Sequence, residues 1–406
     1  MARYLKTLLG FFGGLMLLTV LFNVIIDPFD IYRVVELPGI VKTERNNDSS
    51  SRVSVSFEIL RGDYDAVFIG NSRVQQTITD GMLGDGQTVL NAGMPALNAY
   101  ELARAIRLVP ANGRVRCVFV GLESEMFSTL GSGKGTYWIS ALPDAAPTWA
   151  RLRVSVAYAT IVHGWRTLVA NIKGKTAPHG LTPLDPHEQH EKFVTTARRS
   201  YATFRSYEYD PKRVDLVSRA IAQATARGVQ VIGYFSPVHA WRDEVSWRSG
   251  HGEDMLRLRK EMTAAFNKAA AHKATRQCAQ GPSAILWDFG GYQPVSQSPV
   301  PAVNASSAPP YYREASHYSR LVAQAMVRRM LNQPSQLPIE LGFGRQLTPA
   351  TVADEMLAIR ERRERWLASS PDAAEIVRLT AQWLKSDAPD PTTDRYYLSR
   401  SDFEGF

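Results

Sequence analysis

Five short apolar runs alternate with helix-length stretches along the middle of this chain, and this alternation constrains the fold more than any other feature. The runs predict strands at 66–70, 88–91, 115–121, 229–235 and 284–288. Apolar residues recur with helical spacing over 99–108, 211–227, 253–271 and 317–331. Such alternation predicts an α/β domain with a parallel sheet and right-handed crossovers.

A membrane-spanning segment precedes these strands. Residues 8–26 carry no charged side chain, and at about 1.5 Å per residue such a helix just spans a hydrocarbon core of about 30 Å. Arg3 and Lys6 precede it and Asp27 follows it, so the positive-inside rule leaves residues 1–7 in the cytoplasm. No Ala-x-Ala cleavage site follows, which favours an uncleaved signal anchor over a removed signal peptide. We therefore expect a single-pass protein of a bacterial-type inner membrane, with the lipid bilayer as a partner and most of the chain periplasmic.

The rest of the chain divides by composition and spacing. A juxtamembrane linker is predicted at 27–59, the α/β domain at 60–332, and a C-terminal helical extension at 333–406. Residues 127–210 are too many for one crossover, so we expect an insertion or lid there that frames an acyl or glycan site.

Charge and cysteine content narrow the class of protein. The net charge is +8, but the basic residues are dispersed among 39 acidic ones, so no nucleic-acid partner is predicted; anionic lipid or acidic glycan would be attracted at long range. Cys117 and Cys278 are the two cysteines, which excludes a disulfide scaffold but leaves open whether they are bridged. No His-x-x-x-His or Cys-x-x-Cys spacing occurs, so neither a metal nor a cofactor is predicted.

Two short motifs far apart in the sequence suggest a nucleophile and its base. The motif Gly-Asn-Ser-Arg at 70–73 ends the first predicted strand, and Glu-Ala-Ser-His occupies 314–317. A serine hydroxyl needs an imidazole to remove its proton and a carboxylate to fix the imidazole tautomer. Ser72 is thus the predicted nucleophile, His317 the base and Glu314 the orienting acid. Each motif alone also fits a turn or a helix cap.

An early serine and a late carboxylate-x-x-His resemble the SGNH (GDSL-like) hydrolase superfamily, over roughly residues 60–332. That superfamily comprises esterases, lipases and acyltransferases, and the resemblance implies a three-layer, flavodoxin-like fold. The order of motifs is most similar to that of membrane-anchored members acting on cell-envelope polymers, such as the D-alanyl transfer proteins. The resemblance assigns the catalytic roles to Ser72, His317 and Glu314, although the family usually has Asp at the third position; Glu serves in other serine hydrolases.

The oxyanion hole departs from the family pattern. The resemblance assigns one donor to the Ser72 N–H and one to Gly93, but Glu123 stands where the family has Asn. A carboxylate donates no hydrogen bond unless protonated, and losing one such donor costs about 2.7–4 kcal/mol. Either Asn71, Asn91 or Arg73 replaces it, or the site is slow or not catalytic. The Arg73 guanidinium would hold an anionic substrate or intermediate, or pair with Glu123.

Two further residues follow predicted strands at the edge where open α/β sheets bind ligands. His239 is an alternative base to His317, and Asp288 an alternative acid to Glu314. The adjacent carboxylate favours His317.

These features predict a membrane-anchored, SGNH-like serine esterase or O-acyltransferase. Its substrate would be an acyl ester of an envelope glycan, a lipid-linked polymer or an acyl carrier. The alternative is a catalytically degenerate SGNH-like module that binds glycan or scaffolds a membrane acyltransferase partner. The sequence does not separate hydrolysis from acyl transfer.

Overall fold

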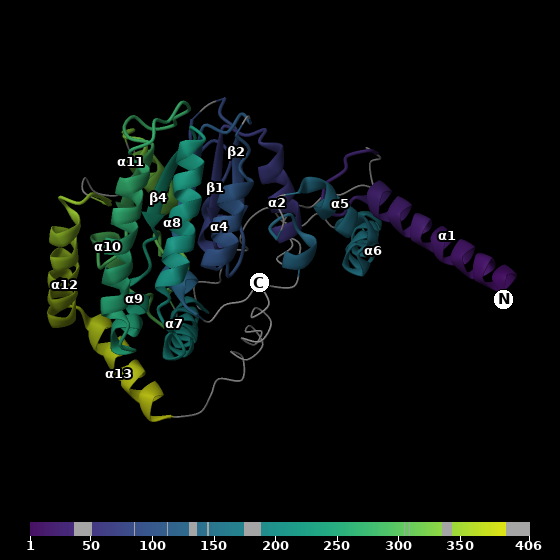
Figure 1. The fold of residues 1–406 in the computed structure, drawn as a ribbon. Coiled ribbons are helices and arrows are strands. Elements are labelled where there is room, and N and C mark those ends of the chain that lie inside the picture. The colour runs from purple at the N-terminus through teal and green to yellow at the C-terminus, as the bar shows by residue number, and fades with distance from the viewer. Residues whose placement is uncertain are drawn as a thin grey trace. The chain divides into compact units, whose positions relative to one another are not determined.

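A computed structural model gives the fold, drawn in Figure 1. It describes residues 1–35, 51–84, 86–111, 113–129, 136–143, 146–173, 188–303, 305–307, 309–334 and 343–386. The chain divides into two compact units. Unit 1 comprises Met1–Gly62 and Gly133–Leu181, and unit 2 comprises Asp63–Ser132 and Thr182–Phe406.

Unit 2 is built on a six-stranded sheet in the order β2-β1-β3-β4-β5-β6. The strands are β1 (Ala66–Gly70), β2 (Val89–Gly93), β3 (Cys117–Leu122), β4 (Gln230–Phe235), β5 (Ala284–Asp288) and β6 (Arg345–Leu347). The first five are parallel, and β6 pairs antiparallel with β5. This confirms the predicted α/β class, and the order of the first five strands is the flavodoxin-like one.

Helices cover both faces of this sheet. On one face lie, side by side, α4 (Ala99–Leu108), α8 (Pro211–Ala226) and α10 (Gly252–Ala269), as Figure 1 shows. Right-handed crossovers place α3 (Ser72–Thr77) on the other face, where it contacts α11 (Arg320–Met330). The core on the α3 and α11 side includes Phe68 and Phe119, whose rings stack with centroids 4.1 Å apart.

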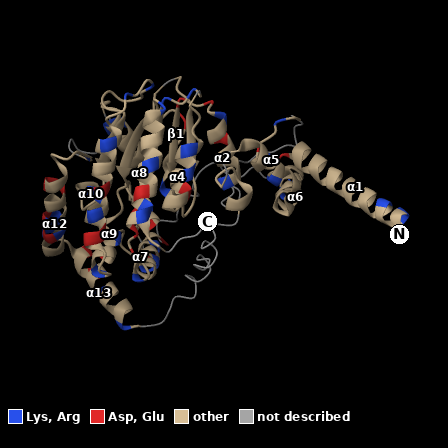
Figure 2. Ribbon diagram, in the orientation of Figure 1, with Lys and Arg blue, Asp and Glu red and all other residues tan. Residues whose placement is uncertain are grey.

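The region after 333 is part of unit 2. It supplies β6 and two helices, α12 (Val352–Ser369) and α13 (Pro371–Lys385), the first of which carries interspersed charges in Figure 2. These helices pack on α10 and on α9 (Ala240–Arg248). The Trp241 indole N–H donates to the Asp372 carbonyl at 2.9 Å, and Arg363 pairs with buried Glu244 at 2.8 Å. Residues 387–406 lie outside the described part of the chain.

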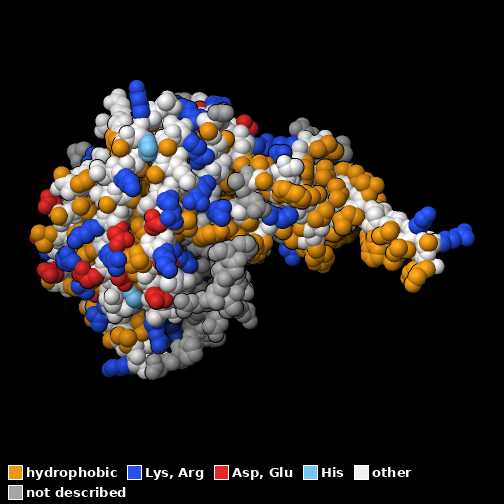
Figure 3. All heavy atoms as spheres, in the orientation of Figure 1, with side chains coloured by type: hydrophobic (Ala, Val, Ile, Leu, Met, Phe, Trp, Pro, Cys, Tyr) orange, Lys and Arg blue, Asp and Glu red, His pale blue; other side chains and the backbone are white. Residues whose placement is uncertain are grey.

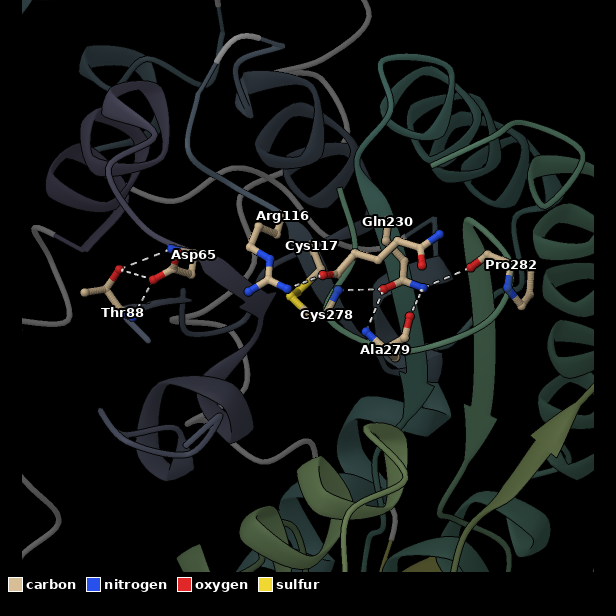
Figure 4. The surroundings of a disulfide bond; sticks show 9 residues. Asp65, Thr88, Arg116, Cys117, Gln230, Cys278, Ala279 and Pro282 are labelled. Atoms are coloured by element: carbon tan, nitrogen blue, oxygen red, sulfur yellow. Dashed lines mark hydrogen bonds between the residues drawn. A yellow bond between two sulfur atoms is a disulfide. The ribbon is translucent and has the colours of Figure 1, made fainter. Parts of the chain in front are cut away.

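A disulfide joins Cys117, the first residue of β3, to Cys278 in the segment before β5. Gln230 at the start of β4 fixes that segment, as Figure 4 shows. Its Oε1 accepts the N–H groups of Cys278 and Ala279, and its Nε2 donates to the carbonyls of Ala279 and Pro282. The disulfide settles the pairing that the sequence left open. Together with the apolar N-terminal helix, it suggests an extracytoplasmic location.

Unit 1 contains that N-terminal helix, α1 (Ala2–Ile26), which is long and apolar enough to cross a membrane. Its other helices are α2 (Ser51–Arg61), η2 (Tyr137–Ile139), α5 (Pro147–Val156) and α6 (Tyr158–Ile172). Where 27–59 was expected to be a linker, the structure places α2, and residues 36–50 lie outside the description. Helices α5 and α6 meet at Ala157.

The long segment between β3 and β4 starts and ends at one place in unit 2. Ser128 forms an isolated bridge with Tyr209, and the Thr129 N–H donates to the Glu208 carbonyl at 2.9 Å. Within that excursion 133–181 belongs to unit 1, whereas α7 (Gln189–Arg205) belongs to unit 2.

Candidate active site

Ser72 lies where β1 turns into α3. Asn71 caps the helix, its Oδ1 accepting the Arg73 N–H at 2.9 Å, so Ser72 is the first helical residue. The turn is tight at Gly70, where a Cβ would come within 2.4 Å of a Val74 methyl carbon. Because the chain crosses to β2 on one side of β1 while β3 lies on the other, Ser72 stands at the topological switch point, where open α/β sheets bind ligands.

The structure brings His317 and Glu314 to this serine. Ser72 Oγ lies 2.8 Å from His317 Nε2, and His317 Nδ1 is hydrogen-bonded to Glu314 Oε1. The helix expected from 317 begins only at Arg320, so the histidine sits in a loop. Ser72 and His317 are partly exposed, and Glu314 is buried. The three side chains thus form a chain of hydrogen bonds with its serine end open to solvent.

Electrostatics keep Glu314 ionised. Burial alone would raise its pKa, but His317, the Ser316 N–H at 2.8 Å and Thr196 on α7 together lower the pKa of Glu314 to about 2. An ionised carboxylate at Nδ1 requires the imidazole proton there, which leaves Nε2 free to accept the proton of Ser72.

Of the two roles predicted for Arg73, the structure has the pairing with Glu123. Its side chain is 2% exposed, so it is unavailable to a substrate. Nε donates to the Ser316 carbonyl and Nη2 to the Ser316 hydroxyl, both at 2.7 Å, while Nη1 faces Glu123 at 2.8 Å and Glu125 at 3.0 Å. The guanidinium therefore points into the protein, because three oxygen-bearing residues surround it there.

Glu123 faces Arg73 in a buried cluster. Burial, together with Glu125, raises its pKa to about 7, although Arg73 opposes this shift. The side chain of Glu125 is 25% exposed, and Arg242, which it meets at 2.8 Å, and Arg73 lower its pKa to about 2. A cavity of about 30 Å³, room for one water, adjoins these carboxylates. Glu125 was not predicted from the sequence. Its position two residues after Glu123, just beyond the strand beside Ser72, could have indicated that it lies near the site.

The groups expected to line an oxyanion hole divide into two kinds. Asn91 Nδ2 donates to three carbonyls of α3 and its end, and Asn91 Oδ1 accepts the Gly93 N–H at 3.0 Å. These donors already have protein acceptors, contrary to the expected role. The Ser72 N–H lies in the first turn of α3, where no intrahelical acceptor exists, and the Asn71 amide nitrogen has no acceptor among the described residues. These two groups remain available as donors.

His239 and Asp288 have structural partners. His239 Nε2 donates to the Ser298 carbonyl at 2.7 Å and its Nδ1 accepts the Trp241 N–H, while burial lowers its pKa to about 4. The His239 N–H also donates to the Ala315 carbonyl, which supports the loop of Glu314. Asp288 is paired with Arg259.

Within the described ranges, no group of three or more His, Cys, Asp or Glu side chains could hold a metal ion.

Three comparisons relate this chain to known families, curated proteins and solved structures. Neither a protein family nor a curated protein matches it. Among solved structures it is similar to "a putative platelet activating factor from Streptococcus pneumonia", at 12% identity and a TM-score of 0.33. The alignment covers 69% of this chain and 90% of the other. A similarity this distant assigns neither a family nor an activity.

Proposed function

We propose that this protein is a serine esterase or O-acyltransferase that acts through an acyl-enzyme on Ser72. One observation carries the proposal: Ser72 Oγ lies 2.8 Å from His317 Nε2, and the opposite ring nitrogen is bonded to Glu314. A serine hydroxyl placed this way is activated for nucleophilic attack.

The reaction runs in two steps. Ser72 Oγ attacks the ester carbonyl while His317 Nε2 takes its proton, and the tetrahedral oxyanion is held by the Ser72 N–H and the Asn71 amide. Collapse breaks the ester C–O bond; His317 returns the proton to the leaving alkoxide, and the acyl group stays on Ser72. A water or a sugar hydroxyl then attacks the acyl-enzyme, with His317 again removing and returning one proton. The second nucleophile decides between hydrolysis and transfer.

The proposed substrate class follows from location. The apolar N-terminal helix and the disulfide suggest a site outside the cytoplasm. We therefore propose an acyl ester of an envelope glycan or of a lipid-linked polymer, at the surface of the membrane that holds α1. A membrane acyltransferase partner would supply acyl groups to such a site.

The best support in the sequence for a non-catalytic binding module is Glu123, whose charge would oppose an oxyanion. In unit 2 that carboxylate pairs with Arg73. Labelling of Ser72 therefore decides between an enzyme and a non-catalytic binding module.

Fluorophosphonate labelling of the full chain in detergent tests the proposal. We expect the wild type to be labelled and the label to disappear in Ser72→Ala and in His317→Ala. Ser206→Ala, an exposed serine beyond α7, is the matched control and should label as wild type. A folded wild type that takes up no label would overturn the hydrolase proposal and favour the binding module.

A further inference from the structure

Two helices of unit 1 expose an unusual amount of apolar surface. The exposed apolar side chains, called here the α5–α6 apolar face, are Trp149, Leu152, Val156, Tyr158, Trp165 and Ile172. They follow i, i+3, i+7 on α5 and i, i+7, i+14 on α6, so each helix presents one stripe. Figure 3 shows hydrophobic side chains gathered over this part of the chain and along α1.

These helices pack against the last turns of α1. The Asn23 side-chain amide donates to the Ser155 carbonyl at 2.8 Å, and Asn23 is fully buried. Gly164 of α6 touches Phe22 so closely that a Cβ would lie 2.8 Å from the ring. The Tyr32 hydroxyl donates to the Arg151 carbonyl at 2.7 Å. The end of α1 is therefore an integral part of the fold of unit 1.

The helices α5 and α6 contact α1 near its C-terminal end, which lies at the membrane boundary. The helix has 25 residues, about 37 Å at about 1.5 Å per residue, whereas the hydrocarbon core is about 30 Å thick. Its Lys and Arg residues lie at the N-terminal end, as Figure 2 shows. Beyond the other end, Arg33 pairs with Asp30 at 2.7 Å and with Glu58 at 2.8 Å, which marks the aqueous side. Residues 22–26, and the helices packed on them, thus lie where the bilayer meets water.

We propose that α5 and α6 lie in the outer interfacial layer of the bilayer, with the α5–α6 apolar face among the lipid acyl chains. The apolar surface of α1, exposed as far as Ile25, continues onto that face, so one lipid phase would cover both. Trp and Tyr favour this depth because their rings are apolar and their N–H and O–H groups are polar. Exposed Arg151 and Arg166 would meet anionic headgroups.

The inference is independent of the proposed chemistry. It gives part of the insertion the role of a membrane platform, in place of the lid that the sequence suggested. It also requires α1 to stay attached, because cleavage after it would remove Phe22 and Asn23 from unit 1.

Spin labels report the depth directly. Both cysteines are in the disulfide and none is free, so an introduced cysteine is the sole labelling site. The full chain is placed in nanodiscs of phosphatidylethanolamine and phosphatidylglycerol, with labels at Leu152→Cys and Ile172→Cys. Leu15→Cys in α1 is the membrane control, and Lys212→Cys on exposed α8 is the aqueous control.

We expect collisions with oxygen, relative to collisions with a water-soluble nickel chelate, to be several-fold more frequent at Leu152 and Ile172 than at Lys212. Ratios equal to that at Lys212 would overturn the proposal, as would an aqueous ratio at Leu15. Low collision rates with both reagents would also overturn it, since they would mean that a second copy or another protein covers this face.

Discussion

The guanidinium of Arg73 donates to both the carbonyl and the hydroxyl of Ser316, each at 2.7 Å. Arg73 follows the candidate nucleophile in the chain, and Ser316 precedes the candidate base. One buried side chain therefore joins the two segments whose separation sets the distance from Ser72 to His317. Arg73 acts as a positioning residue in this arrangement, without touching a substrate.

Ser316→Ala should slow the labelling of Ser72 while the protein stays folded. The change removes one acceptor from a charged donor, which costs about 1.5–3 kcal/mol of unfolding free energy, and it loosens the loop of His317. The measurement is the rate of fluorophosphonate labelling beside the melting temperature. Ser200→Ala is the matched control, because Ser200 accepts a hydrogen bond from buried Arg242 in the same way. Equal labelling rates in the two variants would show that Ser316 acts on stability alone.

Glu314→Gln should abolish most of the activity and leave the fold intact. The Gln amide can donate to Nδ1, which favours the tautomer with its proton on Nε2, facing Ser72. Comparable substitutions in serine hydrolases reduce kcat by about 10⁴-fold. The check is hydrolysis of an aryl ester by the purified full chain, with Glu314→Asp as the variant that keeps the charge. Activity of the Gln variant within tenfold of wild type, about 1.4 kcal/mol, would contradict an orienting role.

Gly93→Ala should displace α3 and, with it, Ser72. A Cβ at this position would lie 2.2 Å from the Gln75 backbone nitrogen, which no side-chain rotation relieves. We expect a loss of about 1–3 kcal/mol in stability together with slower labelling. At Gly121 a Cβ would meet a Val74 methyl carbon at 3.2 Å, so Gly121→Ala is the milder control. If Gly93→Ala is as stable and as readily labelled as Gly121→Ala, close packing is not the reason for a glycine here.

Much of the fold could be predicted from local patterns. The run at β1 predicts a buried strand through its short length, its Val, Ile and Phe content and the polar residues that bound it. The meeting of Ser72 with the 314–317 loop could be anticipated because both lie beyond the carboxyl ends of parallel strands. The catalytic roles of Ser72, His317 and Glu314 themselves stay predictions until labelling tests them.

Other features depend on partners that no local pattern reveals. β6 has three residues, two of them exposed, so it shows no apolar run; its pairing with β5 defines it. For Arg73 the sequence offered a substrate contact beside the pairing with Glu123, because Ser316 and Glu125 come near Arg73 only in the folded chain. Gly93 looked like an oxyanion donor, whereas its N–H is bonded to Asn91 and its lack of a side chain admits α3.

Glu123 and Glu125 share Arg73 but should change stability with pH in opposite ways. The pKa of Glu123 is raised from 4.5 to about 7, first by burial. Between those pH values the folded protein holds a proton that the unfolded chain has released, so stability falls as pH rises through this window. The pKa of Glu125 is lowered to about 2; its contribution is therefore present above pH 4.5 and is lost as pH falls toward 2.

The wild type should lose on the order of 2–3 kcal/mol of unfolding free energy between pH 4.5 and 7 through Glu123. Glu123→Gln removes this loss, so the variant should become more stable relative to wild type as pH rises. Glu125→Gln should be destabilised by about 1.5–3 kcal/mol near pH 7, because buried Arg242 loses a charged partner. Thermal unfolding of the full chain in detergent from pH 5 to 8 measures both. A Glu123→Gln variant whose melting temperature differs from wild type by the same amount at every pH would mean that Glu123 is already ionised throughout, and that Arg73 outweighs burial in setting the charge behind Ser72.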